Sequence, residues 1–144
     1  MKVVLKNIFI YTFGFFILIQ VLQVDIKNTP TNPKDEIKAP KEVMAILKRS
    51  CYDCHSNSAK LPWYSKVAPI SWTISRHIKI GRKWVNFSIW ETYTPEQKDK
   101  KLQEIYKAVY RVMPLQSYVS QHSEAKLSKE DRDLIRSWTG KAPF

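Results

Sequence analysis

Cys51-Tyr52-Asp53-Cys54-His55 is the stretch of sequence that decides how the rest of the chain is interpreted. It has the form C-x-x-C-H, which is typical of the covalent attachment site of c-type haem. Two thiols three residues apart at a helix end can both reach the vinyl groups on one edge of a porphyrin, and the adjacent imidazole can then bind the iron. We therefore expect one covalently attached haem c, held by Cys51 and Cys54, with His55 as an iron ligand.

Other uses of two closely spaced cysteines fit the sequence less well. A thioredoxin-like redox pair belongs next to a βαβ pattern, and the chain has no alternating strand pattern of useful length. A zinc site needs four ligands, whereas the remaining histidines, His77 and His122, have no paired spacing. With only two cysteines and three histidines in the chain, this arrangement is improbable by chance.

The second axial ligand of the iron is predicted to be Met113. Met113-Pro114 lies 58 residues (113 − 55) after His55, directly behind a predicted helix. A loop stiffened by proline would hold the sulfur against the iron, and a thioether ligand raises the reduction potential and suits electron transfer. His77 and His122 remain alternative ligands.

Hydrophobic spacing predicts an all-α domain, and together with the C-x-x-C-H motif this indicates a small cytochrome-c-like domain. The clearest helix begins at the capping box Thr94-Pro95-Glu96-Gln97 and continues with an apolar stripe at helical spacing. Ser128 and Asp131 begin the last helix, which Gly140 ends, and Gly81 is predicted to cap an earlier one. The four helices are expected over residues 41–50, 69–81, 95–109 and 128–138.

An apolar segment at the N-terminus predicts a transmembrane helix that acts as a signal-anchor. Asn7–Val24 carries no charge, and its length is at the lower edge of the roughly 17–25 residues that span a bilayer. Lys2 and Lys6 before it favour a cytoplasmic N-terminus. A cleaved signal peptide is the alternative, although no small-x-small cleavage site lies near the end of the segment.

The chain is accordingly divided into three parts. Pro30, Pro33 and Pro40 interrupt any helix after the apolar segment and predict a linker. The expected location is the inner (cytoplasmic) membrane, with the haem domain in the periplasm or on the outer face. The predicted parts are the anchor over residues 1–24, the linker over 25–40 and the c-type haem-binding domain over 41–144.

Basic residues outnumber acidic ones, which bears on the choice of partner. The chain has 24 Lys and Arg against 13 Asp and Glu, a formal net charge of +11. Such a charge favours an acidic partner. The basic residues are dispersed and no nucleic-acid-binding motif is present, so an acidic redox protein is expected and nucleic acid is not.

Beyond the C-x-x-C-H, further motifs resemble those of a known family. They are Leu61-Pro62-Trp63-Tyr64, Ala68-Pro69-Ile70-Ser71-Trp72, His77 with Gly81-Arg82, Asn86-Phe87-Ser88-Ile89-Trp90, and Met113-Pro114-Leu115 with Tyr118 and His122. From about Pro33 to Trp138 the sequence resembles the bacterial haem-binding domain family of small cytochrome-c-like proteins. The resemblance implies a helical haem domain behind a hydrophobic segment and an Asn-Pro linker; it implies no substrate or reaction. Lys83-Trp84-Val85 departs from the more polar stretch expected there.

Within the resembling region, several side chains are candidates for contact with haem. Aromatic residues could form a wall that excludes water, with ordinary core packing as the alternative; they are Trp63, Tyr64, Trp72, Phe87 and Trp90. A propionate could accept a hydrogen bond from Asn86, Arg82 or Trp90.

The function expected from the sequence is electron transfer by a membrane-anchored cytochrome c that is not an enzyme. A haem occupied on both axial sides suits a carrier, because no coordination position is left for a substrate. The alternatives are a peroxidase-like haem enzyme and a small-gas sensor module whose distal ligand is displaced.

Overall fold

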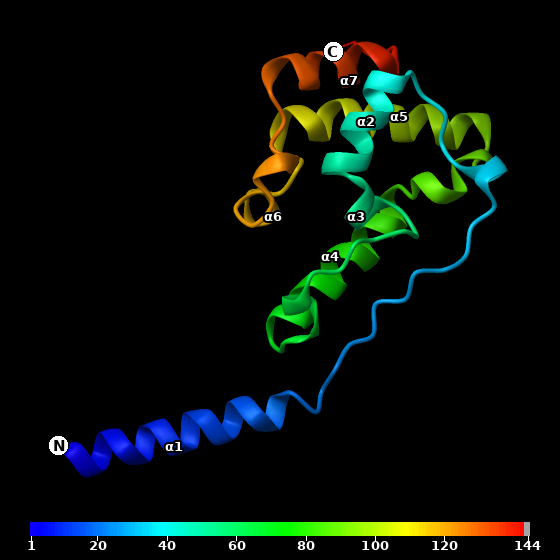
Figure 1. The fold of residues 1–144 in the computed structure, drawn as a ribbon. Helices are drawn as coiled ribbons and strands as arrows, with labels where there is room; N and C mark the ends of the chain where they lie inside the picture. Colours follow the sequence, from blue (N-terminus) through cyan, green and yellow to red (C-terminus); the bar gives the residue numbers. More distant parts are fainter. Residues whose placement is uncertain (143–144) are drawn as a thin grey trace.

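The computed structural model describes residues 1–142, and within that range the chain forms helices and connecting segments with no strand. The predicted all-α class is confirmed (Figure 1). The α-helices are α1 (Lys2–Ile19), α2 (Lys41–Ser50), α3 (Tyr52–His55), α4 (Ile70–Trp84), α5 (Pro95–Arg111), α6 (Gln116–Val119) and α7 (Lys129–Thr139). Short 3-10 helices connect them: η1 (Pro33–Asp35), η2 (Trp63–Lys66), η3 (Phe87–Thr92) and η4 (Ser123–Ala125).

Two helices begin at the capping boxes that the sequence predicts. The Thr94 side chain accepts a hydrogen bond from the N–H of Gln97, and the Gln97 side chain accepts one from the N–H of Thr94. Ser128 and Asp131 form the same reciprocal pair at the start of α7. Gly140 ends α7 in the left-handed region at φ 63°, where glycine has no steric penalty. These local signals alone fix both ends of α7 and the start of α5.

Helix α4 is longer than predicted, because Gly81 is not its C-terminal cap. The helix continues to Trp84, and Val85 closes it by donating its N–H to the carbonyl of Gly81. Gly81 is therefore an interior helix position. The absence of a side chain there serves a tertiary contact with the C-x-x-C-H segment, described below.

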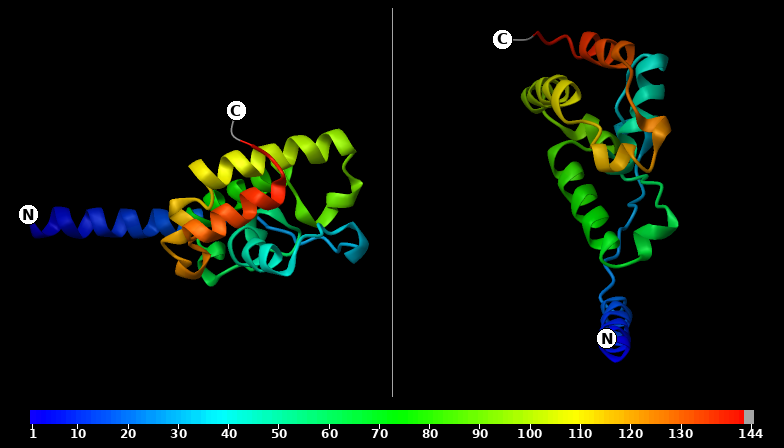
Figure 2. Two further views of the ribbon diagram at one scale, coloured as in Figure 1. Left: turned by 90° about the horizontal axis from the view of Figure 1, so that it is seen from above. Right: turned by 90° about the vertical axis from the view of Figure 1, so that its left-hand side faces the viewer.

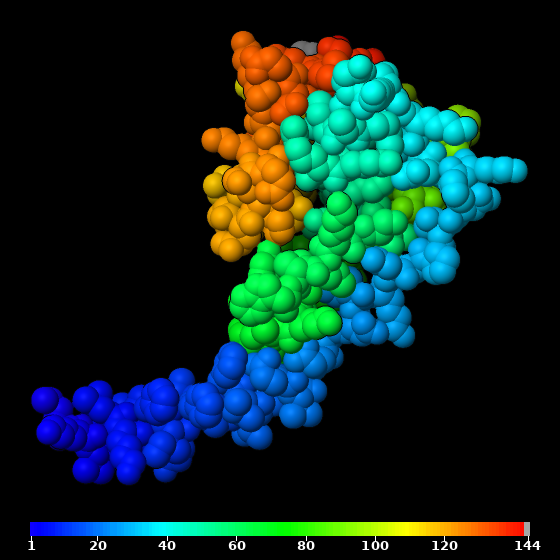
Figure 3. Space-filling model, in the orientation of Figure 1, coloured from blue at the N-terminus to red at the C-terminus, as the bar shows by residue number. Residues whose placement is uncertain are grey.

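Helix α1 stands apart from the rest of the molecule (Figure 1 and Figure 2). Its residues are unburied, and it is apolar enough to cross a membrane by length and composition. Signal sequences and anchors share that property. The domain lies beside the C-terminal end of α1, with the η2 region nearest to it (Figure 3).

The segment predicted as a linker is partly built into the domain. Ile37 is buried in the hydrophobic core and donates its N–H to the carbonyl of Phe87, 2.8 Å away. The packed domain therefore begins before residue 41, because Ile37 belongs to its core. The preceding residues 25–32 contain no helix.

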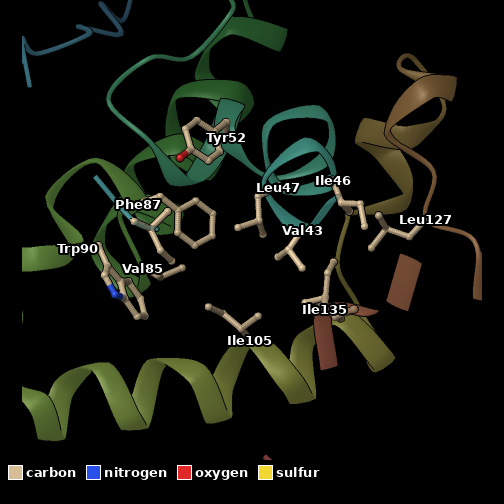
Figure 4. Packing of buried hydrophobic residues seen from close by; sticks show 12 residues of the cluster. Val43, Ile46, Leu47, Tyr52, Val85, Phe87, Trp90, Ile105, Leu127 and Ile135 are labelled. Carbon is tan, nitrogen blue, oxygen red and sulfur yellow. The ribbon is translucent and has the colours of Figure 1, made fainter. Parts of the chain in front are cut away.

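The hydrophobic core lies between α2, η3, α5 and α7 (Figure 4). Leu47 and Val43 of α2 face Phe87 of η3, Ile105 of α5 and Ile135 of α7. Their burial supplies the main driving force for packing these elements, at about 1.5–3 kcal/mol for each large apolar side chain. Helix α3 packs against this core through Tyr52. Helix α4 packs against α3 and forms one wall of a cavity, described below.

Candidate functional site

The C-x-x-C-H segment forms a single helical turn at the end of α2. Cys51 closes α2 and precedes α3. Its carbonyl accepts hydrogen bonds from the N–H groups of Cys54 and His55, at 3.2 and 2.9 Å. Positions i, i+3 and i+4 of a helical turn share one face. The side chains of Cys51, Cys54 and His55 therefore lie on the same face of this turn, as the sequence predicts for residues that would bind one cofactor.

These three residues line a cavity of about 570 Å³. Its volume lies within the roughly 300–1,000 Å³ of cofactor sites. Met113 and Phe87 line the same cavity, so the structure brings together five of the residues selected from the sequence. The walls are mainly apolar, and they are contributed by the end of α2, α3, α4, α5 and the segment from Met113 to Tyr118.

The His55 ring is oriented by the main chain of α4. Nδ1 lies 3.1 Å from the carbonyl oxygen of Gly81 and 3.1 Å from that of Val85. Carbonyl oxygens only accept hydrogen bonds, so Nδ1 must carry the proton and Nε2 has a free lone pair. Burial lowers the pKa of His55 and keeps the imidazole neutral, although the two carbonyls oppose that shift. A neutral imidazole with a fixed tautomer is the form that binds iron.

Gly81 allows α4 to approach this turn closely. A Cβ atom at position 81 would lie 2.5 Å from the carbonyl oxygen of Cys54 and 3.1 Å from its carbonyl carbon. Real Cβ atoms do not approach main-chain atoms so closely. Glycine at this position thus sets the distance between α4 and α3, and with it the hydrogen bonds that hold His55.

The two thiols differ from those of a redox-active pair. Burial raises the pKa of Cys51 to about 12, and the nearby Cys54 adds to the shift. Burial likewise raises the pKa of Cys54 to about 11, together with the charge of Asp53. Reactive C-x-x-C pairs depend on thiols whose pKa is lowered. These environments favour the neutral thiol and do not support a thioredoxin-like role.

Met113 is held in place by contacts of its main chain. Its N–H donates to the carbonyl of Ala108 at 2.8 Å. Its carbonyl accepts from the Nη1 atom of Arg132 in α7 at 3.1 Å, and the same atom donates to the carbonyl of Val109. Arg132 therefore fastens the loop to the end of α5. The side chain of Met113 is left to line the cavity.

A second contact ties the far side of this loop to the C-x-x-C-H segment. The hydroxyl of Tyr118 donates to Oδ2 of Asp53 at 2.7 Å. Tyr118 also lines the cavity. Burial and the bond to Asp53 raise the pKa of Tyr118, so this phenol stays protonated and keeps donating. A side-chain hydrogen bond thus joins two segments at the cavity that are distant in sequence.

The two histidines proposed as alternative ligands lie in different surroundings. His77, one turn before Gly81 on α4, lines the cavity. His122 does not; its ring stacks on Tyr118 with the ring centroids 4.2 Å apart, and its Nε2 lies 3.4 Å from the hydroxyl of Tyr64. Of these two, the structure brings only His77 to the cavity with Met113.

Five predicted haem contacts are not among the residues that line the cavity: Trp63, Tyr64, Trp72, Asn86 and Trp90. Trp63 is 79% exposed, and Trp90 is buried in the hydrophobic core. Trp72 donates its Nε1–H to the carbonyl of Leu22. The Asn86 side chain donates to Asn57 and accepts from the N–H of Ser88, so it caps η3. Arg82 donates to the carbonyls of Ser56 and Lys27 and does not line the cavity either.

Other lining residues were not selected from the sequence as site residues. Ile105, Ala108, Val109 and Val112 form one wall along α5. Their spacing of three, four and seven continues the apolar stripe, which the sequence shows but cannot divide between core and cofactor cavity. Trp84, part of the unexpected Lys83-Trp84-Val85 stretch, also lines the cavity.

The residues present fit a covalently bound haem. A fixed neutral imidazole, two neighbouring thiols and a thioether converge on one mainly apolar cavity. Within residues 1–142 there is no group of three or more His, Cys, Asp or Glu side chains that could hold a bare metal ion.

Comparison with known proteins supports a haem-binding domain. The profile of one family, described as a haem-binding domain, matches residues 14–141. No curated protein and no solved structure matches the chain. The matched range covers the C-x-x-C-H segment, the Met113 loop and every helix from α2 to α7.

Proposed function

Because this chain belongs to the haem-binding domain family, we propose that it is a membrane-anchored c-type cytochrome with one covalent haem, and that it transfers electrons without catalysing a reaction. One observation carries the proposal. The imidazole of His55 has its Nδ1 fixed by two main-chain carbonyls and lies in one cavity with Cys51, Cys54 and Met113.

Covalent attachment follows from the placement of the thiols. Each S–H would add across a vinyl C=C, so that a sulfur–carbon bond forms and the hydrogen goes to the other vinyl carbon, with no external oxidant needed. Cys51 and Cys54 are in the right order and spacing, one helical turn apart. His55, directly after them, would bind the iron through Nε2.

Electron transfer is supported by the ligand set. Haem iron supplies one-electron chemistry by cycling between its ferric and ferrous states. The thioether of Met113, held by Ala108 and Arg132, would bind the iron and favour its ferrous state. Apolar side chains of α5 and α4 would exclude water from the porphyrin. No protein group is then required to take up or release a proton.

The anchor and the partner are part of the same proposal. Helix α1 is apolar and unburied, and the preceding charges at Lys2 and Lys6 favour a cytoplasmic N-terminus with the domain in the periplasm or on the outer face. The net charge of +11 would steer the domain to an acidic redox protein.

The attachment is tested by denaturation. Full-length protein produced in a host that attaches haem c should keep its haem in denaturing gels, because thioether bonds survive unfolding. The double variant Cys51→Ala, Cys54→Ala should lose it under the same conditions. Haem that acid–acetone extracts from the unaltered chain would contradict covalent attachment.

The carrier role is tested with carbon monoxide. The reduced protein should not bind it while Met113 holds the iron, and the oxidised protein should show the far-red thioether–iron absorption band. Ready binding by the unaltered chain would instead support the gas sensor or haem enzyme. If His77→Ala opens the iron and Met113→Ala does not, the ligand is His77.

A further inference from the structure

The segment that follows α1 is bonded directly to the haem domain. The Gln20 side chain pairs with the main chain of Ala68: Ala68 N–H donates to Oε1 at 2.9 Å, and Nε2 donates to the Ala68 carbonyl at 3.1 Å. Trp72 donates its Nε1–H to the carbonyl of Leu22 at 2.7 Å. The first residues after the helix therefore lie against η2 and the start of α4.

More bonds follow a few residues later. The side chain of Asn28 donates to the Ala59 carbonyl at 2.9 Å and accepts from the Ala59 N–H at 3.1 Å. Arg82 donates to the carbonyl of Lys27 and to the side chain of Asn28. A segment bonded at both ends is not a flexible tether. The orientation of the domain relative to α1 is thereby restricted.

This orientation directs one face of the domain toward the membrane that α1 would cross. Helices α1 and α5 run in roughly opposite directions, so the C-terminal end of α5 points the same way as the N-terminus of α1 (Figure 1 and Figure 2). Seen from that side, the end of α5, helix α6, the start of α4 and the adjoining η2 segment face the viewer (Figure 2, right). We call this the α1-side face.

Large apolar side chains are exposed on the segments of the α1-side face. Trp63 of η2 is 79% exposed and Ile70 at the start of α4 is 48% exposed. At the end of α5, Tyr110 is 70% exposed. Tryptophan and tyrosine are the side chains most enriched at membrane–water interfaces, where the ring is apolar on one part and hydrated on another.

Basic residues accompany them on the same segments. Lys60 and Lys66 flank Trp63, and Arg111 lies between Tyr110 and Val112. A face that combines exposed aromatic and basic side chains matches the headgroup layer of a bilayer that contains anionic lipid.

We propose that the α1-side face rests in the headgroup layer of the bilayer that α1 crosses, so that the haem domain is docked on the membrane at a fixed orientation. The proposal rests on the membrane anchor proposed above. The loop that carries Met113 begins at the docked end of α5, which places the haem cavity close to the bilayer surface.

Photo-crosslinking of the full-length, haem-loaded chain in vesicles of phosphatidylethanolamine and phosphatidylglycerol tests the docking. The crosslinker p-benzoylphenylalanine is introduced in place of Trp63, in place of Tyr11 within α1, or in place of Lys34 in η1 at the far end of the domain. Lys34 is exposed, so its position is equally open to a freely moving lipid contact. The expected result is lipid adducts at positions 63 and 11 and no adduct at position 34.

Each other result overturns the docking in a distinguishable way. Adducts at 11 but not at 63 would leave the anchor intact and refute the docked face. Equal amounts of adduct at positions 63 and 34 would show that the domain moves freely on its tether, and would refute the fixed orientation. No adduct at 11 would refute the anchor itself and the docking with it.

A second pair of variants tests the bonds that set the orientation. Gln20→Leu combined with Trp72→Phe removes the hydrogen bonds to Ala68 and Leu22 and keeps an apolar side chain at position 20 and an aromatic one at position 72. The adduct at 63 should fall and that at 11 should stay unchanged. Gln23→Leu is the matched control, because the Gln23 side chain bonds only to the carbonyl of Gln20 within the same segment. An unchanged adduct at 63 in the double variant would show that these bonds do not orient the domain.

Discussion

Replacing Gly81 by alanine should weaken the domain and disturb the haem ligand together. The new Cβ would lie 2.5 Å from the carbonyl oxygen of Cys54, and the neighbouring atom belongs to the main chain, so it cannot swing aside. Overpacking of this kind costs up to about 3 kcal/mol. Alanine gains about 1 kcal/mol over glycine in a helix interior. The expected net loss is therefore up to about 2 kcal/mol, since the two contributions oppose each other.

The loss is measured as a shift of the thermal midpoint of the haem-loaded protein. For a domain of about 100 residues, each kcal/mol lowers Tm by about 4 °C or more, so Gly81→Ala should lower Tm by several degrees, and by roughly 8 °C if the full ~2 kcal/mol is lost. Gly14→Ala is the matched control, because its Cβ would meet no atom within 4 Å. Displacement of the Gly81 and Val85 carbonyls from His55 should also change the reduction potential. A variant with the original or a higher Tm would refute the close approach of α4 to Cys54.

Three further predictions concern the contacts around the cavity and the helix ends. Arg132→Leu removes the donor to Met113 and Val109, so carbon monoxide should bind the reduced variant faster than the unaltered protein, as followed by absorbance. Thr94→Ala removes the capping box of α5 and should cost about 1 kcal/mol in urea unfolding, while Thr94→Ser should not. Burial raises the pKa of Asp131, but bonds from the Ser128 N–H and Arg49 outweigh it and hold that pKa below its ordinary value. The stabilisation is therefore present above the ordinary aspartate pKa and is lost as the pH falls through the lowered value; Asp131→Asn should lose this acid dependence of the unfolding free energy, and equal acid profiles would contradict it.

Local signals in the sequence were sufficient for part of the fold. The capping boxes at Thr94 and Ser128 and the left-handed Gly140 depend on hydrogen bonds and sterics within a few residues, so they can be recognised without knowing the tertiary structure. Gly81 could not be interpreted in that way. Its local setting suits a helix cap, and only the approach of Cys54, 27 residues (81 − 54) earlier, gives it a different role.

The site was predictable where chemistry dictates spacing and unpredictable where packing decides. Cys51, Cys54 and His55 must be adjacent to act on one porphyrin, and Met113 was predicted from its proline-bounded loop; all four line the cavity. The aromatic residues are different, because aromatic character suits a haem wall, a core or an exposed surface equally. Trp63 is exposed, Trp90 is in the core and Trp72 bonds to Leu22, which only the three-dimensional arrangement decides.

The acceptors that orient His55 are both main-chain carbonyls of α4. No single side-chain replacement can delete them, since every residue type supplies the same carbonyl. The orientation of the His55 ring is thus insulated from most mutations, and it changes only if the helix itself is displaced, as a bulkier residue at position 81 would do. The cavity walls on α5, by contrast, are made of replaceable side chains. Single substitutions on α5 can therefore change the polarity of the cavity while the orientation of His55 stays the same.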